Sequence, residues 1–212
     1  MRIFLAGATG VIGIRVLPLL ISAGHTVAGM TRSPHKTGQL RVLGAEPVVC
    51  DVFDAPALTG AVTSFAPDAV VHQLTDLPDQ VDQLPGSAAR NDRMRTEGTR
   101  NLLAAAAAAG VSHILAQSIA WRPAGRGAAT DDMERQVLDA AGVVVRYGQL
   151  YGPGTYYPGE PPAPPRIHVA AAARATVPLL QAPPCVVILT DDTLPRGGPV
   201  SAAARKARRG QE

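Results

Sequence analysis

The chain has 212 residues, a formal net charge of +3, a hydrophobic content of 46% and an aromatic content of 4%. This length fits one domain with a core of Ala, Val, Leu and Ile, and no stretch is long and apolar enough to span a membrane. Much of the positive charge lies in residues 205–209, which indicates a basic tail, and nothing else resembles a nucleic-acid-binding module.

Two cysteines, Cys50 and Cys185, lie at the ends of apolar runs and lack the spacing of metal ligands. We expect buried thiols in a reducing, cytoplasmic setting. The five histidines also lack metal-ligand spacing, so no metal site is predicted. The N-terminus is expected to be the first strand and helix of the fold, and not a signal peptide.

The N-terminal segment is the most informative part of the chain. The apolar run 3–6 predicts a buried strand, and Gly7, Gly10 and Gly13 lead from it into a predicted helix over 11–23. Glycines at a strand-to-helix turn allow close approach of a diphosphate, to which the helix N-terminus presents free N–H groups. A second strand follows at βαβ spacing, so this segment predicts dinucleotide binding.

Apolar runs alternate with helical segments along the rest of the chain. Strands are expected at 2–6, 26–30, 46–50, 69–72, 112–117, 143–147 and 185–190, and helices at 11–23, 34–43, 55–65, 91–109, 129–141 and 168–181. This alternation predicts an α/β fold with a doubly wound parallel sheet and helices on both faces. Gly110 and Gly142 are expected to cap the helices that precede them.

Regular structure is expected to weaken after Tyr147. Residues 151–165 are rich in proline and glycine, which predicts a loop or lid. We therefore divide the chain into a nucleotide-binding domain over 1–150, a short lid segment over 151–193 that completes the fold, and a disordered tail over 194–212.

The polar residues that follow the predicted strands indicate one shared site. Gly7, Arg32, Asp51, His72 and Ser118 each come directly after a strand. Ligands of doubly wound sheets bind at the carboxyl ends of the strands, so we expect these residues at one edge.

Several segments resemble the extended and atypical short-chain dehydrogenase/reductase superfamily, in its NAD-dependent epimerase/dehydratase branch. They follow the family's order, and they are residues 7–13, Asp51-Val52, Val71-His72, 96–103, Gln117-Ser118, 146–154 and 167–169. The resemblance implies a Rossmann-type sheet with a reduced C-terminal substrate lid and a nicotinamide cofactor.

The resemblance also implies roles for individual residues. The diphosphate would lie on Gly7, Thr9, Gly10, Val11, Ile12 and Gly13. Asp51 and Val52 would contact the adenine, and His72 and Gln73 would line the ribose of the nicotinamide half. Asn101 would be a structural helix residue, and Ser118 would face the substrate carbonyl.

The residues after the second strand favour NADP over NAD. An NAD site usually places an acid there to accept hydrogen bonds from the ribose hydroxyls. This strand is instead followed by Arg32 and Ser33, which can bind a 2′-phosphate. The alternative is that Arg32 is only a solvated charge.

The sequence departs from the family at the catalytic pair, a tyrosine with a lysine four residues later. The only lysines are Lys36 and Lys206, and the two positions fall near Arg126 and Thr130. Three hypotheses remain. The favoured one is an NADPH-dependent reductase of a ketone or quinone-like carbonyl. The others are a non-catalytic NADP-binding sensor or scaffold, and an epimerase- or dehydratase-like enzyme acting on a sugar nucleotide.

In the favoured hypothesis, Ser118 hydrogen-bonds the developing alkoxide. Trp121, with Tyr151, Tyr156 and Tyr157, provides a wall for a flat apolar substrate. The proton comes from Tyr156, Tyr157, water ordered by Arg122, or an acidic hydroxyl of the substrate. By analogy with atypical family members, that substrate is a small, polycyclic aromatic carbonyl compound.

Two further expectations concern the helix over 129–141. Asp131, Asp132 and Glu134 are expected to act as helix-start acids that interact favourably with the helix dipole. This helix and the helix over 91–109 would pair in a homodimer, as the family resemblance implies.

Overall fold

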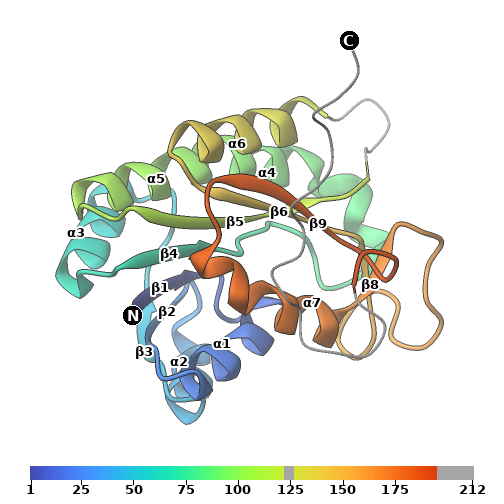
Figure 1. Ribbon diagram of the computed structural model, residues 1–212, viewed down its shortest axis with the longest axis horizontal. Coiled ribbons are helices and arrows are strands. Elements are labelled where there is room, and N and C mark those ends of the chain that lie inside the picture. The colour runs from blue at the N-terminus through green and yellow to red at the C-terminus, as the bar shows by residue number, and fades with distance from the viewer. Residues whose placement is uncertain (122–126, 195–212) are drawn as a thin grey trace.

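The computed structural model describes residues 1–121 and 127–194. Seven parallel strands form one sheet in the order β3-β2-β1-β4-β5-β6-β9, and helices cover both of its faces (Figure 1). The strands are β1 (Arg2–Ala6), β2 (Thr26–Thr31), β3 (Glu46–Val49), β4 (Ala69–His72), β5 (His113–Ile119), β6 (Val143–Tyr147) and β9 (Cys185–Leu189). The predicted doubly wound Rossmann-type sheet is therefore confirmed, and each predicted strand agrees with an observed one to within two residues.

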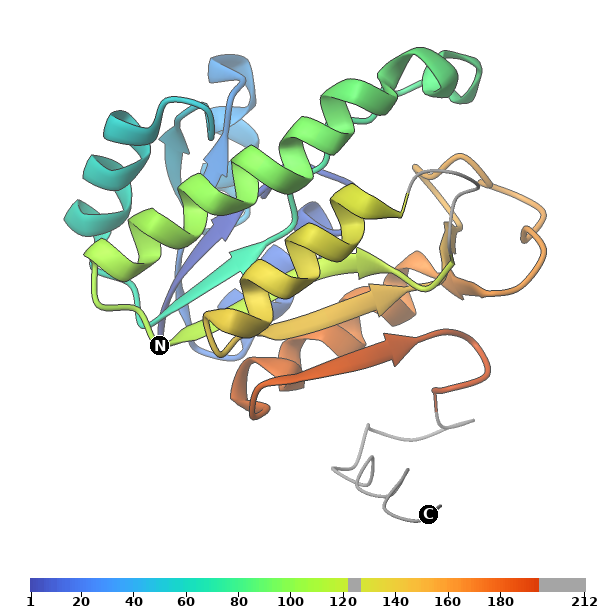
Figure 2. The ribbon, with the colours of Figure 1, turned by 90° about the horizontal axis from the view of Figure 1, so that it is seen from above.

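The helices divide between the two faces. They are α1 (Gly13–Ser22), α2 (Thr37–Val42), α3 (Ala55–Phe65), α4 (Ala88–Arg93), α5 (Thr99–Ala108), α6 (Ala128–Asp139) and α7 (Val169–Thr176), with short 3-10 helices at Pro34–Lys36, Val81–Ser87 and Val177–Gln181. Helices α1 and α7 lie on one face, and α3, α5 and α6 on the other (Figures 1 and 2). No helix in the described ranges is long and apolar enough to cross a bilayer.

Alternation along the strands builds a core on each face of the sheet. Ile3 and Leu5 belong to the core under α1 and α7, whereas Phe4 and Ala6 belong to the core under α3 and α5. Successive side chains of a strand point to opposite faces, so a strand buried on both sides is apolar throughout. This is why the short run 3–6 indicates a central strand.

Three features differ from the expectations. The predicted helix 91–109 is longer at its start, because α4, a π-helical turn at Met94–Gly98 and α5 form one continuous rod (Figure 2). Two short strands, β7 (Gln149–Tyr151) and β8 (Arg166–His168), pair outside the main sheet and bracket the proline-rich segment. Gly142 was expected to cap α6, but the residue with left-handed backbone geometry after this helix is Ala141, with a φ of 55°.

Gly110 does adopt the left-handed conformation after α5, with a φ of 70°. Gly142 has a different purpose, because a Cβ there would lie 2.8 Å from the Val137 Cγ1 atom of α6. The glycine therefore allows the chain to pass closely under the helix as it enters β6.

The sheet register aligns the carboxyl ends of the central strands. Ala6 pairs with His72, which pairs with Ala116, while Ser118 pairs with Arg146. The strand order reverses between β1 and β4, and this switch point is where ligands bind in open α/β sheets.

Candidate functional site

The turn after β1 is packed so closely that two of its glycines, Gly7 and Gly13, cannot carry side chains. Gly7 has a φ of +85°, and a Cβ there would lie 2.6 Å from the carbonyl oxygen of Gln73. A Cβ on Gly13 would lie 2.1 Å from the carbonyl oxygen of Gly7. These glycines hold the turn directly against the end of β4.

The turn contains backbone donors without an acceptor. The Ala8 amide donates to the Met30 carbonyl at 3.1 Å and the Gly10 amide to the Gly7 carbonyl at 3.0 Å. Within the described residues, the amides of Val11 and Ile12 have no acceptor, and Gly10 and Val11 are exposed. Free amides at the N-terminus of α1 form a cradle suited to an anion such as a diphosphate.

A hydroxyl network joins this turn to the end of β2. The Thr9 and Thr31 hydroxyl oxygens lie 3.2 Å apart, and the Thr31 hydroxyl accepts the Ser33 amide at 3.2 Å. Thr31 was not among the predicted site residues, although its place as the last residue of β2 marks the same edge. The network brings Thr9 and Ser33 into one continuous surface.

Arg32 is paired with an acid that the sequence did not identify. Its Nη2 atom lies 2.9 Å from Asp76 Oδ1, and Asp76 comes from the loop after β4. The Asp76 amide in turn donates to the Asn91 side-chain oxygen at 3.1 Å. An acidic side chain therefore does lie beside Arg32, but it comes from the loop after β4 and not from the end of β2.

The loop after β3 is fixed from α5. The Asn101 side-chain amide donates to the Val52 carbonyl at 3.0 Å, and the Asp51 carboxylate accepts the Phe53 amide at 2.9 Å. Val52 is buried, whereas Asp51 is exposed. Asp51 is therefore the member of the pair whose side chain is free to meet a ligand from solvent.

His72 faces inward. Its Nε2 atom lies 2.9 Å from the Thr99 hydroxyl, and its Nδ1 atom accepts the Leu74 amide at 3.2 Å. Burial, with a smaller contribution from Arg95, lowers the pKa of His72 to about 4. The imidazole is therefore neutral and both of its nitrogens are engaged inside the protein.

Gln73 has an unpartnered acceptor. Its side-chain amide donates to the Tyr147 hydroxyl at 3.4 Å, and that hydroxyl lies 2.6 Å from the Thr176 hydroxyl. Burial raises the pKa of Tyr147 to about 12, so the phenol is neutral. The Gln73 Oε1 atom is buried and has no hydrogen-bond partner among the described residues, which is uncommon for a buried oxygen.

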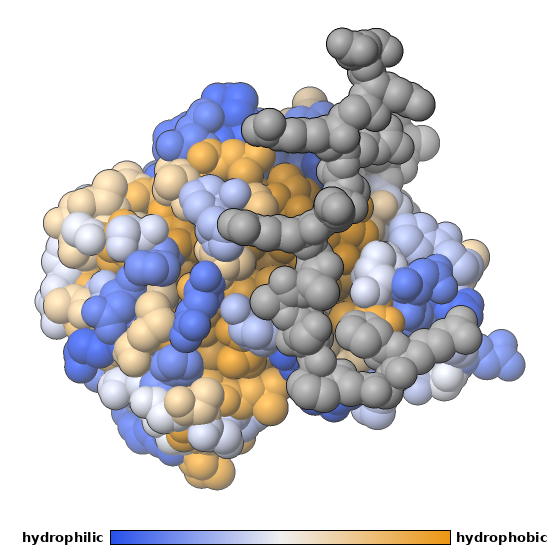
Figure 3. All heavy atoms as spheres, viewed as in Figure 1, coloured by the Kyte–Doolittle hydropathy of each residue, from blue (hydrophilic) through white to orange (hydrophobic). Residues whose placement is uncertain are grey.

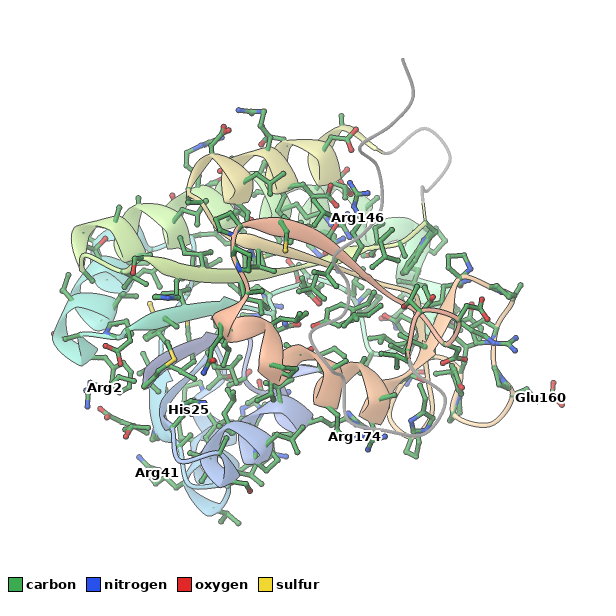
Figure 4. All side chains as sticks on the ribbon, viewed as in Figure 1. Arg2, His25, Arg41, Arg146, Glu160 and Arg174 are labelled. Carbon is green, nitrogen blue, oxygen red and sulfur yellow. The ribbon has the colours of Figure 1, made fainter. Side chains whose placement is uncertain are left out.

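Ser118 belongs to a buried charge cluster. Its hydroxyl donates to the Glu134 carboxylate at 2.5 Å, and Arg146 donates to the same carboxylate from Nε at 2.9 Å and from Nη2 at 2.5 Å. Burial would raise the pKa of Glu134, but the hydrogen bonds from Arg146 and Ser118 outweigh it and hold that pKa below its usual value. Figure 4 shows Arg146 projecting from the sheet on the side of α6.

This cluster corrects the expected role of Glu134. Its side chain is buried on the inner face of α6 and is not an exposed acid at the helix start. The single Ser118 proton is donated to Glu134, so the Ser118 oxygen has only acceptor capacity left.

The expected aromatic wall is divided between separate places. Trp121 lines a small pocket of about 80 Å³ that Thr130 and Glu134 also line. Tyr151 instead donates to Asp191 at 3.0 Å, and Tyr156 donates to the Pro78 carbonyl of the loop after β4.

The remaining predicted catalytic positions are only partly described. Arg122 and Arg126 lie outside the described residues. Thr130, at the expected lysine position, is buried, and its hydroxyl accepts a hydrogen bond from Arg95.

The segment between β7 and β8 projects from the body of the protein. It lies at the right of Figure 1, its visible surface is largely hydrophilic in Figure 3, and Glu160 points outward from it in Figure 4. A cavity of about 350 Å³ lies at the opposite, amino-terminal edge of the sheet, beside His113 and Leu179. The described residues contain no group of three His, Cys, Asp or Glu side chains that could hold a metal ion.

A family model described as NAD(P)H-binding matches residues 7–144. The chain belongs to this NAD(P)H-binding family. The match begins at the first glycine of the turn and ends at the start of β6, so it includes the carboxyl ends of β2, β3, β4 and β5.

Individual relatives extend this result. A 3-diazoavenalumate denitrifying reductase from a Streptomyces species is 38% identical over 182 residues, which cover 74% of this chain and 59% of that protein. A 4-hydroxy-2-methyl-3-oxo-4-farnesyl-3,4-dihydroquinoline-1-oxide ketoreductase from Stigmatella aurantiaca is 31% identical over 120 residues, covering 49% of this chain and 35% of that one. The chain thus spans less than two thirds of the length of either relative.

The fold is shared with a UDP-glucose 4-epimerase from Thermotoga maritima. Its TM-score is 0.74 at 17% sequence identity, over 90% of this chain and 77% of that one. The expected nicotinamide-dinucleotide-binding family and the Rossmann-type fold shared with an epimerase are therefore confirmed.

The Arg146–Glu134 pair should dominate the stability of the α6 face. In Arg146→Leu, the Glu134 carboxylate, whose side chain is 7% exposed, loses both guanidinium donors. We expect a loss of about 3 kcal/mol in the free energy of unfolding, measured by urea denaturation at neutral pH. The double variant with Glu134→Leu should recover most of it, whereas a single variant as stable as wild type would contradict the pairing.

Proposed function

We propose that this family member binds NADPH and uses it to reduce a small aromatic carbonyl compound. The observation that carries the proposal is the glycine cradle, in which the Val11 and Ile12 amides have no acceptor among the described residues and Gly10 and Val11 are exposed. In this proposal the cradle holds the diphosphate, together with Gly7, Thr9, Gly10 and Gly13. When bound, the cofactor supplies a hydride.

The other predicted cofactor residues fit the same placement. Asp51, exposed beside the anchored Val52, would accept a hydrogen bond from the adenine amino group. The orphaned Gln73 Oε1 would accept one from a ribose hydroxyl of the nicotinamide half. His72 would support that half through its backbone, because its ring is engaged with Thr99.

The preference for NADPH over NADH rests on Arg32 and Ser33. The Arg32 side chain is 58% exposed, so most of its donors face solvent despite the pair with Asp76. Arg32→Ala should weaken NADPH binding about tenfold and leave NADH binding nearly unchanged, because only NADPH carries the 2′-phosphate. Fluorescence titration of both nucleotides measures this. Equal weakening for both would show that Arg32 does not contact the phosphate.

The proposed substrate pocket lies between Trp121 and the Ser118 cluster. Trp121 would provide an apolar wall of this pocket. Tyr156 does not line it, because its hydroxyl donates to the Pro78 carbonyl, so Tyr156 would act as proton donor only after that contact is exchanged for the substrate. Ser118 would orient the substrate by accepting a hydrogen bond, which favours a carbonyl compound that also carries a hydroxyl group. Residues 151–193 would form the reduced lid.

A diazo-bearing aromatic compound is the second candidate substrate. The relative from Streptomyces is a diazo-compound denitrifying reductase, and it shares 38% identity with this chain. Hydride addition to a diazonium group, followed by loss of dinitrogen, forms no alkoxide. It therefore needs no proton from Ser118, whose only proton is donated to Glu134.

A panel assay separates these possibilities. NADPH oxidation would be followed with hydroxyquinones, simple aromatic ketones and an aromatic diazo compound, and dinitrogen release would be measured for the last. Turnover of a carbonyl supports the first proposal, and turnover of the diazo compound alone supports the second. Tight NADPH binding without any turnover would favour a sensor or scaffold, and turnover of a sugar nucleotide would favour the epimerase-like alternative.

Two features bear on the setting of this activity. Cys50 is buried as expected, whereas Cys185 is only half-buried, and both thiols are free. The proposed setting is reducing and cytoplasmic, where free thiols persist. A homodimer through α5 and α6 remains the proposed assembly, and sedimentation analysis tests it.

A further inference from the structure

Three charged residues from separate parts of the chain meet beside the end of β2. Asp76, from the loop after β4, lies 2.9 Å from Arg32 Nη2 through Oδ1 and 3.8 Å from Arg90 Nε through Oδ2. Arg90 belongs to α4 and is not among the site residues predicted from the sequence. One carboxylate thus holds two guanidinium groups together.

The Asp76 carboxylate is held in place by its surroundings. The Asp76 side chain is 13% exposed, and its amide is bound to the buried Asn91 of α4 at 3.1 Å. Two guanidinium groups repel each other, and Asp76 offsets that repulsion in the free protein. Arg32, Arg90 and Asp76 together carry a net charge of +1, so this cluster attracts anions.

Both guanidinium groups retain donors for a ligand. Each has five N–H donors, and the side chains of Arg32 and Arg90 are 58% and 62% exposed. Phosphate oxygens accept such donors strongly, and two arginines from different elements can bind one phosphate from two sides.

We infer that Arg90 is a second specificity-determining residue for the 2′-phosphate of NADPH, held in place beside Arg32 by Asp76. The inference rests on the proposed use of NADPH. The α4 helix thereby takes part in cofactor selection, and Asp76 aligns the two arginines. An exposed ion pair without this role would leave cofactor preference untouched when it is removed.

The test compares 2′,5′-ADP with 5′-AMP by calorimetric titration of the full chain, because these probes differ only by the 2′-phosphate. Arg90→Gln should reduce the preference for 2′,5′-ADP about fivefold, and Arg32→Ala should reduce it about tenfold. Arg93→Gln is the matched control, since Arg93 is exposed on the same helix and pairs with Glu97 at 2.7 Å. It should keep the wild-type preference.

The outcomes separate this inference from the proposed function. An unchanged preference in Arg90→Gln, with loss in Arg32→Ala, would overturn the inference and leave the NADPH proposal standing. A wild-type protein that binds both probes equally would overturn both. Melting curves of each variant should match wild type, because all three arginine side chains are more than half exposed.

Discussion

Gly7→Ala is expected to abolish binding of both NADPH and NADH. The new Cβ would lie 2.6 Å from the Gln73 carbonyl oxygen, and the residue would have to keep a φ of +85°. The turn must therefore move away from β4 and distort the cradle. We expect affinity to fall more than about tenfold and unfolding free energy to fall by about 2 kcal/mol, measured by titration and urea denaturation.

Two further glycine variants test whether the loss of binding is specific to the position of Gly7. Gly10→Ala should remain folded, because its Cβ would lie no closer than 3.3 Å to another atom, the Gly7 carbonyl oxygen. Gly10 is exposed in the cradle, so the added methyl group should weaken binding. Gly60→Ala, within α3 and with no atom within 4 Å of its Cβ, should bind normally and gain about 0.5–1 kcal/mol of stability. Normal binding by Gly7→Ala would refute the cradle.

Acid should destabilise the protein through His72. Its pKa is about 4 in the folded protein and 6.5 in an ordinary setting, so between these values only the unfolded chain takes up the proton. Stability must then fall as the pH falls from 6.5 toward 4, by about 3 kcal/mol in total. Urea denaturation between pH 7 and pH 5 should record about 2 kcal/mol of this loss.

The pH dependence should become weaker when the His72 imidazole is removed. His72→Gln will be less stable at neutral pH, because the contacts to Thr99 and Leu74 change, but it should lose stability more slowly on acidification than wild type. The exposed His35→Gln is the control and should keep the wild-type slope. Equal slopes in wild type and His72→Gln would show that His72 takes up its proton without unfolding.

The sheet could be predicted because buried parallel strands are short apolar runs. Residues 3–6 and 143–147 are such runs, and glycines follow the helices between strands. The pair β7–β8 could not be predicted, because strands of three residues beside a proline-rich segment carry no periodic signal. The 3-10 helix at Val81–Ser87 was also not predicted, because its residues carry no periodic signal.

The candidate site was only half predictable. Residues that directly follow strands, such as Gly7 and Arg32, could be placed from chain order alone. Asp76 could not, because its approach to Arg32 depends on how the loop after β4 folds onto α4. Glu134 did leave a signal, since it shares the buried face of α6 with Thr130, Met133 and Val137, and an acid at a core position requires a partner.

Binding of a nicotinamide dinucleotide by the glycine cradle can be measured by isothermal titration of the purified chain with NADPH. We expect saturable binding of one NADPH per chain in about the micromolar range, and tighter binding than that of NADH under the same conditions. A folded protein that binds neither nucleotide at about 1 mM would contradict it.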